Sequence, residues 1–406
     1  MKMKKTIALI LALVMVFALT ACGGNASSNA PSTPNTNANA NTGTAENNAP
    51  AEKPAASDPE VTLTVALFNN AGNPHEPVLN YIFAETYNRS GGTVKFDYYP
   101  GGTICGQADM LDGILNGVAD IGYLQTADNG SAMPELSVLD YPGIYFASAP
   151  AISNAVHEYI ETYKPAELDG LKFLCASYGT KGCICSNASP IHTPDDLVGT
   201  TIRATGNNGK CITNLGGTPA DVSMADCYEA IRTGVVDGIM TIRGAIYTFN
   251  LDEVLDYGMD YPLYNNGGLF VMNESAWEKL TPNQQAALQS AVDDAWEICW
   301  NKFFNDFYKE PAAKRLKENL EEYYYPTDEE IALFTSKVEH IAKEYCGTID
   351  NGDEIFQRWS DLAEKWNAVY PAKSDDDPDM YIALDPNTGE RLQCGSGVTF
   401  EFNLPY

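Results

Sequence analysis

A single arginine at the end of a short apolar stretch is the residue of this sequence best placed to hold an anion. Residues 200–203 (Thr-Thr-Ile-Arg) are predicted to form a buried strand that carries one cation, Arg203. A guanidinium can bind both oxygens of a carboxylate at once. We therefore predict that Arg203 holds an anion. The alternative is an arginine that bridges to an acid in the core.

Polar side chains also stand at the carboxyl ends of other predicted strands. They are Asn69, Tyr123, Gln125, Tyr178 and Thr241. In α/β sheets, ligands lie beyond these strand ends, where side chains from neighbouring strands meet. We expect these residues to give hydroxyl, amide or ring contacts to the same ligand. The alternative for each is packing within a loop.

The elements that must position these residues alternate between strand and helix. Around Arg203, Thr193 and Ser223 have capping-box spacing to acids three residues on, and Gly199 and Gly234 end the two turns. Further strands are predicted near 61–67, 93–98, 119–123, 171–178, 254–259 and 267–272, with helical spacing between many of them. This alternation favours an α/β fold with parallel sheets.

The last third of the chain is predicted to be mainly helical. Thr281 and Thr327 are capping residues, and an apolar stripe from 288 to 308 is expected to pack in the core before Pro311 ends it. Another helix is predicted near 353–369. Residues 371–406 form a tail in which two short apolar stretches around a turn suggest a hairpin.

Residue types needed for catalysis or for metal binding are sparse. The chain has four histidines, and no Gly-x-Ser-x-Gly element accompanies them. The pair Cys183 and Cys185 is too closely spaced for an ordinary zinc knuckle, and the acidic run 375–379 lacks the ligand ladder of a calcium loop. We therefore expect a protein that is not an enzyme and uses no metal and no cofactor.

The composition is that of an acidic globular protein. Apolar residues make up 44% of the chain, and the formal net charge is -29. Such a surface repels nucleic acid and anionic lipid, so nucleic acid is not an expected partner. An anionic ligand would have to be held by a local cation against this global field.

The N-terminus has the features of an export signal. Residues 1–21 combine three early lysines with a short apolar run, and the sequence Leu-Thr-Ala before Cys22 resembles the bacterial lipobox. That resemblance implies cleavage before Cys22 and lipid on its sulfur. The alternative is an ordinary signal peptide. Residues 22–59 are predicted to be the lipid anchor and a flexible spacer, which would leave the protein outside the cytoplasm and tethered to the cell membrane by lipid alone.

Several motifs, taken in order, resemble the solute-binding subunits of tripartite ATP-independent periplasmic (TRAP) transporters. In the first half they are residues 98–102 (Tyr-Tyr-Pro-Gly-Gly), 117–122 (Gly-Val-Ala-Asp-Ile-Gly) and 140–146. In the second half they are 190–199, Ile202 with Arg203, 215–219, 229–238 and 272–280. The resemblance covers roughly residues 60–370.

This resemblance implies the two-lobe (Venus-flytrap) fold of periplasmic binding proteins, with crossing strands and a long bracing helix. Ligand would bind in the cleft, with Arg203 paired to its carboxylate. The implied organisation is mainly lobe 1 for 60–180, mainly lobe 2 for 181–275, and helices shared by the lobes for 276–370.

Two places depart from the family pattern. Where many members carry a further arginine, this chain has Cys183, with Lys181 nearby. After Gly238, where members often have an acid followed by Asn or Trp, it has Met240, Thr241 and Arg243. Arg243 is therefore either a second contact to the anion or a solvated surface cation.

The function implied is capture of an organic acid and its delivery to TRAP membrane permease subunits. A subunit that presents ligand to a membrane sensor is the alternative, because its binding residues could be the same. A secreted hydrolase is disfavoured because the histidines are scattered and no nucleophile motif is present.

Overall fold

The computed structural model describes residues 58–71, 73, 75–179, 182–261, 264–296 and 312–371. Several predicted features lie outside these residues. They are the signal peptide, the lipidation site Cys22, the spacer, Lys181, the end of the apolar stripe with Pro311, and the hairpin in the tail. The described residues all fall within one compact unit, Ala56–Tyr406.

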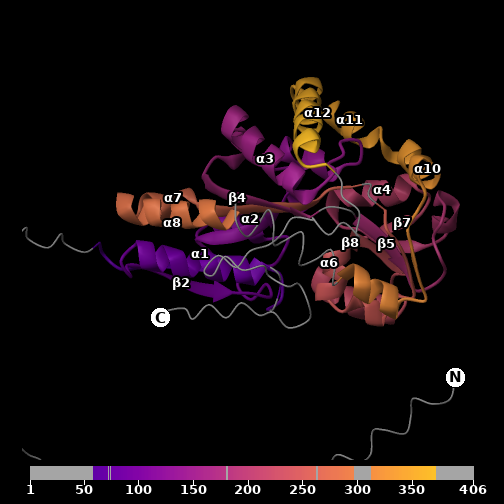
Figure 1. Cartoon of the computed structure of the whole chain (residues 1–406), viewed down its shortest axis with the longest axis horizontal. Helices are drawn as coiled ribbons and strands as arrows, with labels where there is room; N and C mark the ends of the chain where they lie inside the picture. Colours follow the sequence, from indigo (N-terminus) through magenta and orange to yellow (C-terminus); the bar gives the residue numbers. More distant parts are fainter. Residues whose placement is uncertain are drawn as a thin grey trace, which may run out of the picture. The chain divides into compact units, whose positions relative to one another are not determined.

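The first lobe is built on a five-stranded sheet with the order β2-β1-β3-β10-β4 (Figure 1). Its strands are β1 (Val61–Ala66), β2 (Val94–Tyr99), β3 (Ile121–Gln125), β4 (Leu171–Gly179) and β10 (Asn266–Asn273). The pairs β1–β2 and β1–β3 are parallel, whereas β10 runs antiparallel to β3 and to β4.

The second lobe is built on a six-stranded sheet with the order β11-β9-β5-β8-β6-β7. Its strands are β5 (Gly182–Ser186), β6 (Thr201–Arg203), β7 (Thr218–Ala220), β8 (Gly238–Ile242), β9 (Tyr257–Met259) and β11 (Glu322–Tyr324). Here β5 is the strand that runs antiparallel to its neighbours β8 and β9.

The sheets are mainly parallel, as the alternation of strand and helix predicts, but each of them contains one antiparallel strand. The chain changes sheets three times: after β4, after β9, and between β10 and β11. The antiparallel strands β5 and β10 are the first strands formed after the first two crossings, whereas β11 enters the second sheet parallel to β9. Residues 182–186, where no strand is predicted from the sequence, form β5. Strand β10 joins the first sheet although it falls within 181–275, the range predicted to belong mainly to lobe 2.

The same local turn precedes the inner strand of each sheet. Gly117 and Gly234 have φ values of 72° and 74°, a conformation that glycine adopts without steric cost. Three residues later, Asp120 and Asp237 each accept a backbone N–H from the neighbouring parallel strand, Thr64 and Thr201 respectively, at 2.8 Å in both cases. These turns fix the residues at which β3 and β8 begin.

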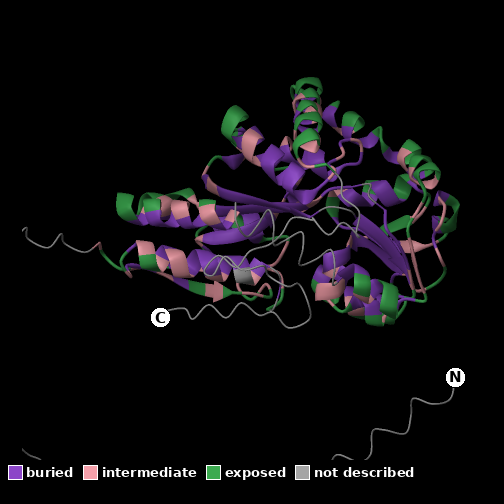
Figure 2. Cartoon of the chain, in the orientation of Figure 1, coloured by how far each residue is buried: buried purple, intermediate pink, exposed green. Residues whose placement is uncertain are grey.

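Helices cover the sheets, and their exposed faces point outward, while the strands are largely buried (Figure 2). The helices associated with the first sheet are α1 (His75–Arg89), α2 (Met110–Leu115), α3 (Ala149–Tyr163), α7 (Glu274–Glu278) and α8 (Pro282–Asp294). Those of the second lobe are α4 (Gly209–Asn214), α5 (Cys227–Arg232) and α6 (Arg243–Thr248). The C-terminal helices are α10 (Asp328–Val338), α11 (Ile341–Cys346) and α12 (Gly352–Val369).

The C-terminal helices contact both lobes. Helix α12 packs against α3 of the first lobe, as Figure 1 also shows, and α10 contacts α4 of the second. The side chains of Tyr159 and Trp359 stack with ring centroids 4.0 Å apart at the α3–α12 contact. Helix α8 packs on α1, within the first lobe. The residues from 297 to 311 are outside the described part, so the predicted long bracing helix stays a prediction.

The predicted helix caps differ in their outcome. Thr193, Thr281 and Thr327 each form a capping box with the residue three positions on. Ser223 does not cap a helix with its side chain; its Oγ donates to Asp226 Oδ2 at 2.6 Å, and helix α5 begins only at Cys227. The seven cysteines within the described residues are free and buried, where a cysteine packs as a small apolar side chain.

Candidate ligand-binding site

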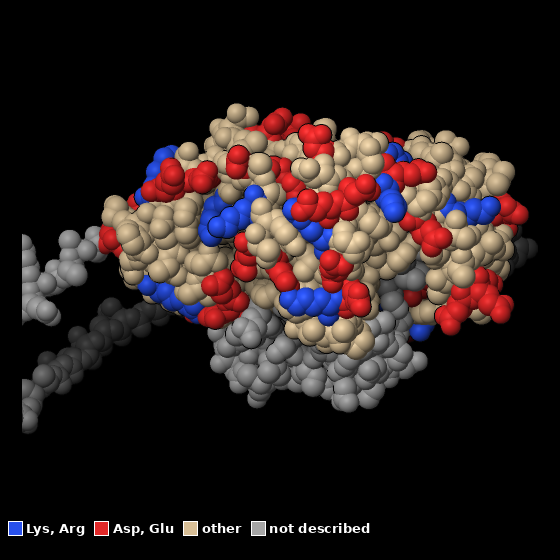
Figure 3. All heavy atoms as spheres, turned by 90° about the horizontal axis from the view of Figure 1, so that it is seen from above, with Lys and Arg blue, Asp and Glu red and all other residues tan. Residues whose placement is uncertain are grey.

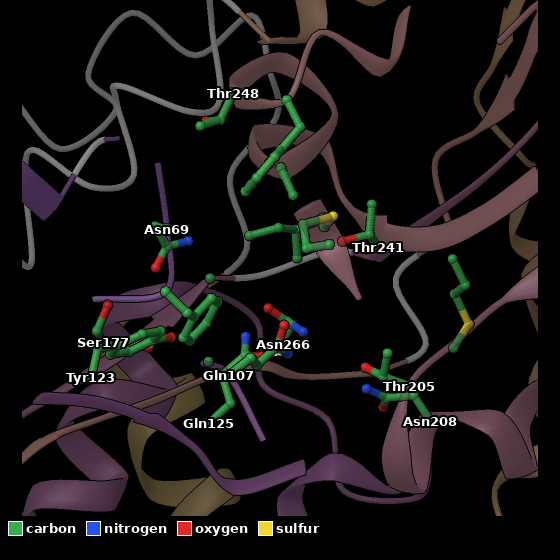
Figure 4. Close-up of a pocket in the computed structure, with 18 of the residues that line it drawn as sticks. Asn69, Gln107, Tyr123, Gln125, Ser177, Thr205, Asn208, Thr241, Thr248 and Asn266 are labelled. Atoms are coloured by element: carbon green, nitrogen blue, oxygen red, sulfur yellow. Dashed lines mark hydrogen bonds between the residues drawn. The ribbon is translucent and has the colours of Figure 1, made fainter. Parts of the chain in front are cut away.

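A cavity lies at the edge where strand ends of the two sheets meet (Figure 4). The first lobe lines it with residues that follow β1 and with the ends of β3, β4 and β10. The second lobe lines it with the ends of β6 and β8 and with residues from α6. Its volume is about 60 Å³. Of the seven ligand residues predicted from the sequence, five line this cavity: Asn69, Tyr123, Gln125, Arg203 and Thr241.

Arg203 is the one permanently charged side chain among the described lining residues. It ends β6 and is only 5% exposed. Its Nε donates to the backbone oxygen of Val222 at 2.9 Å, which fixes the direction of the guanidinium. Within the described residues no ion pair includes Arg203, so the alternative of a bridge to a core acid is not observed.

In the first lobe, two glutamines that line the cavity, Gln107 and Gln125, are hydrogen-bonded to each other. Gln107 Nε2 donates to Gln125 Oε1 at 2.8 Å and to Asp128 Oδ2 at 2.7 Å, and Figure 4 shows Gln107 and Gln125 close together. Burial raises the pKa of Asp128, while the hydrogen bond from Gln107 and the charge of Arg203 oppose this shift. Gln125 is therefore held in position by hydrogen bonds within its own lobe.

An aromatic group forms the floor of the first-lobe side. The rings of His75 and Tyr123 have centroids 4.7 Å apart, and Phe68 lies 5.7 Å from Tyr123. Burial lowers the pKa of His75 to about 3, so this imidazole is neutral at physiological pH. His75 therefore adds a polar ring, but no second positive charge, to the cavity.

The second lobe contributes mainly neutral polar groups. Thr205 and Asn208 follow β6 in the segment that contains the 3-10 helix η5 (Gly206–Asn208), Thr241 lies in β8, and Thr248 ends α6. Asn208 Oδ1 and Thr248 Oγ1 are buried and have no hydrogen-bond partner in the described structure, and the same is true of Asn69 Oδ1 in the first lobe. These are polar atoms that a ligand can satisfy.

Two predicted ligand residues are not among those that line the cavity. Tyr178 is buried, and its hydroxyl lies 3.3 Å from Thr126 Oγ1. Its neighbour Ser177 lines the cavity instead, because successive residues of a strand point to opposite faces. Arg243 begins α6, is 5% exposed, and its Nε lies 3.7 Å from Asp260 Oδ1. It is thus not the solvated surface cation that was one of its two predicted roles.

Sequence reasoning missed lining residues that depend on the tertiary fold. Gln107, Ser177, Thr205, Asn208 and Asn266 all line the cavity. Gln107 and Asn208 lie away from strand ends, and only the packing of the lobes brings them in. Ser177 could have been found from the strand alternation that excludes Tyr178.

The fold and the site together define a class: a binding protein with two α/β lobes and, between them, a cavity whose described lining includes one buried cation, Arg203. The profile of bacterial extracellular solute-binding protein, family 7, matches residues 68–348. This chain belongs to that family, the solute-binding proteins of TRAP transporters. Members act outside the cytoplasm as receptors rather than as enzymes. Within the described residues, no helix has the length and apolar character needed to cross a bilayer.

Characterised relatives and solved structures bind different acids. A C4-dicarboxylate-binding protein of Bacillus subtilis is 26% identical over 275 residues, which cover 65% of this chain and 76% of that protein. A TRAP solute-binding protein from a marine metagenome, specific for aromatic acids, has a TM-score of 0.70 at 22% identity and covers 76% of this chain and 100% of its own. The sugar-acid-binding protein of Advenella mimigardefordensis, in complex with galactonate, has a TM-score of 0.70 at 19% identity, with 76% and 99% covered. The structural matches confirm the predicted two-lobe fold.

Proposed function

We propose that this chain binds an organic acid in the cavity between its lobes and that Arg203 holds the carboxylate. The observation that carries the proposal is the isolation of that one charge. Arg203 is buried, its terminal nitrogens form no ion pair with a described carboxylate, and the other described lining residues carry no permanent charge. In a cavity with little water, a guanidinium and a carboxylate attract each other more strongly than at the surface.

The other predicted lining residues complete the site. Asn69, Tyr123, Gln125 and Thr241 would contact the body of the acid, two sheets contributing from opposite sides. Tyr178 and Arg243 are not assigned a ligand contact, since one packs beneath the cavity wall and the other is close to Asp260. The acids named for relatives support the ligand class without selecting among its members.

The transport role extends this proposal. An exported protein tethered through lipid on Cys22, with residues 23–59 as a spacer, would capture the acid outside the cytoplasm and hand it to TRAP permease subunits. Family membership supports the transport role, and the lipobox-like sequence before Cys22 supports the anchor.

Native mass spectrometry of the purified full chain tests the binding function. We expect a small organic acid to copurify with the wild-type chain and to be absent from Arg203→Gln. Arg232→Gln is the matched control, because it removes an equal charge from the exposed pair with Glu229. Equal retention of the acid by both variants would refute the assignment of Arg203.

A further inference from the structure

Three buried polar atoms around the cavity carry information about the body of the ligand. They are Asn69 Oδ1, Asn208 Oδ1 and Thr248 Oγ1, and none has a hydrogen-bond partner within the described residues. Each belongs to a residue that lines the cavity, and Figure 4 shows the three residues on different sides of it. Asn208 is only 5% exposed, so bulk water does not reach it freely.

Polar atoms of this kind select the groups that face them. Two of the three are amide oxygens, which accept hydrogen bonds, and the third belongs to a hydroxyl, which can donate or accept. A ligand hydroxyl satisfies any of them. An alkyl chain or an aromatic ring placed against them leaves buried polar atoms unpaired, which lowers affinity by about fivefold to a hundredfold for each atom.

The charge of the cavity limits how many carboxylates the ligand carries. Arg203 supplies the permanent positive charge among the described lining residues, and His75 is neutral at physiological pH because burial lowers its pKa to about 3. A second carboxylate would enter a buried, polar but uncharged region and would not recover the free energy lost on leaving water.

We propose that the ligand is an aliphatic hydroxy monocarboxylate whose hydroxyl groups bond to Asn69, Asn208 and Thr248 while its single carboxylate pairs with Arg203. This inference rests on the proposed function, since it assumes that Arg203 holds the carboxylate. It adds that the site distinguishes a polyhydroxylated acid from C4-dicarboxylates and from aromatic acids.

Calorimetric titration of the full chain with five probes tests this. The probes are D-gluconate and D-galactonate, with hexanoate as the six-carbon acid without hydroxyls, succinate as the dicarboxylate, and benzoate as the aromatic acid. We expect the better of the two hydroxy acids to bind at least tenfold more tightly than each of the other three. If hexanoate, succinate or benzoate binds as tightly or more tightly, the inference is wrong.

The variant Asn208→Leu tests whether the preference for hydroxy acids over hexanoate arises at this site. It keeps the approximate size of the side chain and removes its polar atoms. It should weaken the preferred hydroxy acid by about threefold to tenfold, as for one lost hydrogen bond, and should leave hexanoate binding unchanged or tighter. Asn214→Leu is the control: Asn214 is an exposed asparagine whose Nδ2 bonds to Lys210 O at 2.9 Å. An unchanged ratio in Asn208→Leu overturns the inference. Binding that does not depend on Arg203 for any probe would instead overturn the proposed function.

Discussion

At the scale of single residues, the proposed ligand binding depends on one buried positive charge, that of Arg203, in a chain with a net charge of -29. Acidic and basic side chains are interspersed on the face shown in Figure 3, so this face has no large basic patch that would attract an anion. Arg203 is different because it is buried, is oriented by Val222, and is the one permanently charged side chain among the described residues that line the cavity. Geometry as well as charge should therefore matter for affinity.

Substitutions of Arg203 separate charge from geometry. We expect Arg203→Gln to weaken carboxylate binding by about tenfold to a thousandfold, the range for truncating a buried charge pair. Arg203→Lys should fall between the wild type and Arg203→Gln, because an ammonium keeps the charge but cannot bind both oxygens in a planar fork. Isothermal titration with the copurified acid measures this order. If Arg203→Lys binds the acid as tightly as the wild type does, the planar geometry of the guanidinium does not contribute to affinity.

The sequence predicted some site residues because they follow from simple rules. Asn69, Gln125 and Arg203 were identified from strand ends, and the structure places all three at the cavity. Tyr178 was not placed correctly because a strand end determines the position along the strand but not the face. The role of Arg243 could not be decided from the sequence, because its position departs from the family pattern; in the structure it begins α6, and its Nε lies 3.7 Å from Asp260 Oδ1.

At the scale of elements, the close contact between the lobes is made by the segments that follow β3 and β6. The 3-10 helix η1 (Thr126–Asn129) lies against η5, and a Cβ added to Gly206 would lie 2.3 Å from the backbone oxygen of Ala127. Gly206 also has a φ of 53°. Since η5 carries Asn208, glycine at this position lets the second lobe approach the first closely enough to complete the cavity.

Gly206→Ala should therefore impair ligand binding as well as stability. The added methyl group has to displace η5 from η1, which moves Thr205 and Asn208 away from the ligand. Gly234→Ala is the matched control, with a φ of 74° but no atom within 4 Å of the added Cβ. Both variants should lose about 1 kcal/mol of stability from backbone strain, but only Gly206→Ala should lose affinity by calorimetry. Equal affinity in the two variants would contradict this role for η5.

A second element-scale prediction concerns Glu167, which holds the start of the 3-10 helix η2 (Leu136–Asp140). Its carboxylate accepts the backbone N–H groups of Glu135 and Leu136, both at 2.8 Å. Burial raises its pKa to about 7 from an ordinary value of 4.5, despite these hydrogen bonds. The folded state therefore binds this proton more tightly than the unfolded state does. The resulting stabilisation is complete below pH 4.5 and is lost as the pH rises through 7.

Urea unfolding at several pH values between 4.5 and 8 measures this contribution. The wild-type free energy of unfolding should fall with rising pH by up to about 3 kcal/mol from this group, and Glu167→Gln should remove that part of the slope. Other buried acids with a raised pKa, such as Asp140, are present in both proteins and cancel in the comparison. Parallel pH profiles for the two proteins would show that Glu167 is ordinarily ionised in the folded state.

Prediction from the sequence worked best where local chemistry determines the element. Three of the four predicted caps form capping boxes, and α12 ends at the predicted residue, Val369. Helix α3 was missed although its signals are present, with Ser148 as N-cap and Pro150 in the first turn. β5 could not be predicted in the same way, because its place depends on the chain crossing to the other lobe rather than on its own residues.

At the scale of the whole described unit, the cavity between the lobes is small. Its volume of about 60 Å³ is below the roughly 300–1,000 Å³ of typical ligand pockets. We therefore predict that the lobes separate when an organic acid of more than a few atoms binds. The chain crosses between the sheets after β4, after β9 and between β10 and β11, and we expect these crossings to absorb such a motion.

The most direct test of the central claim is a crystal structure of the full chain grown with its copurified acid. We expect the acid between the lobes, with both carboxylate oxygens about 2.7–2.9 Å from the guanidinium nitrogens of Arg203. The first-lobe contacts should come from Asn69, Tyr123 and Gln125. A carboxylate bound by Arg243 or by another cation, with Arg203 facing no part of the ligand, would contradict the account.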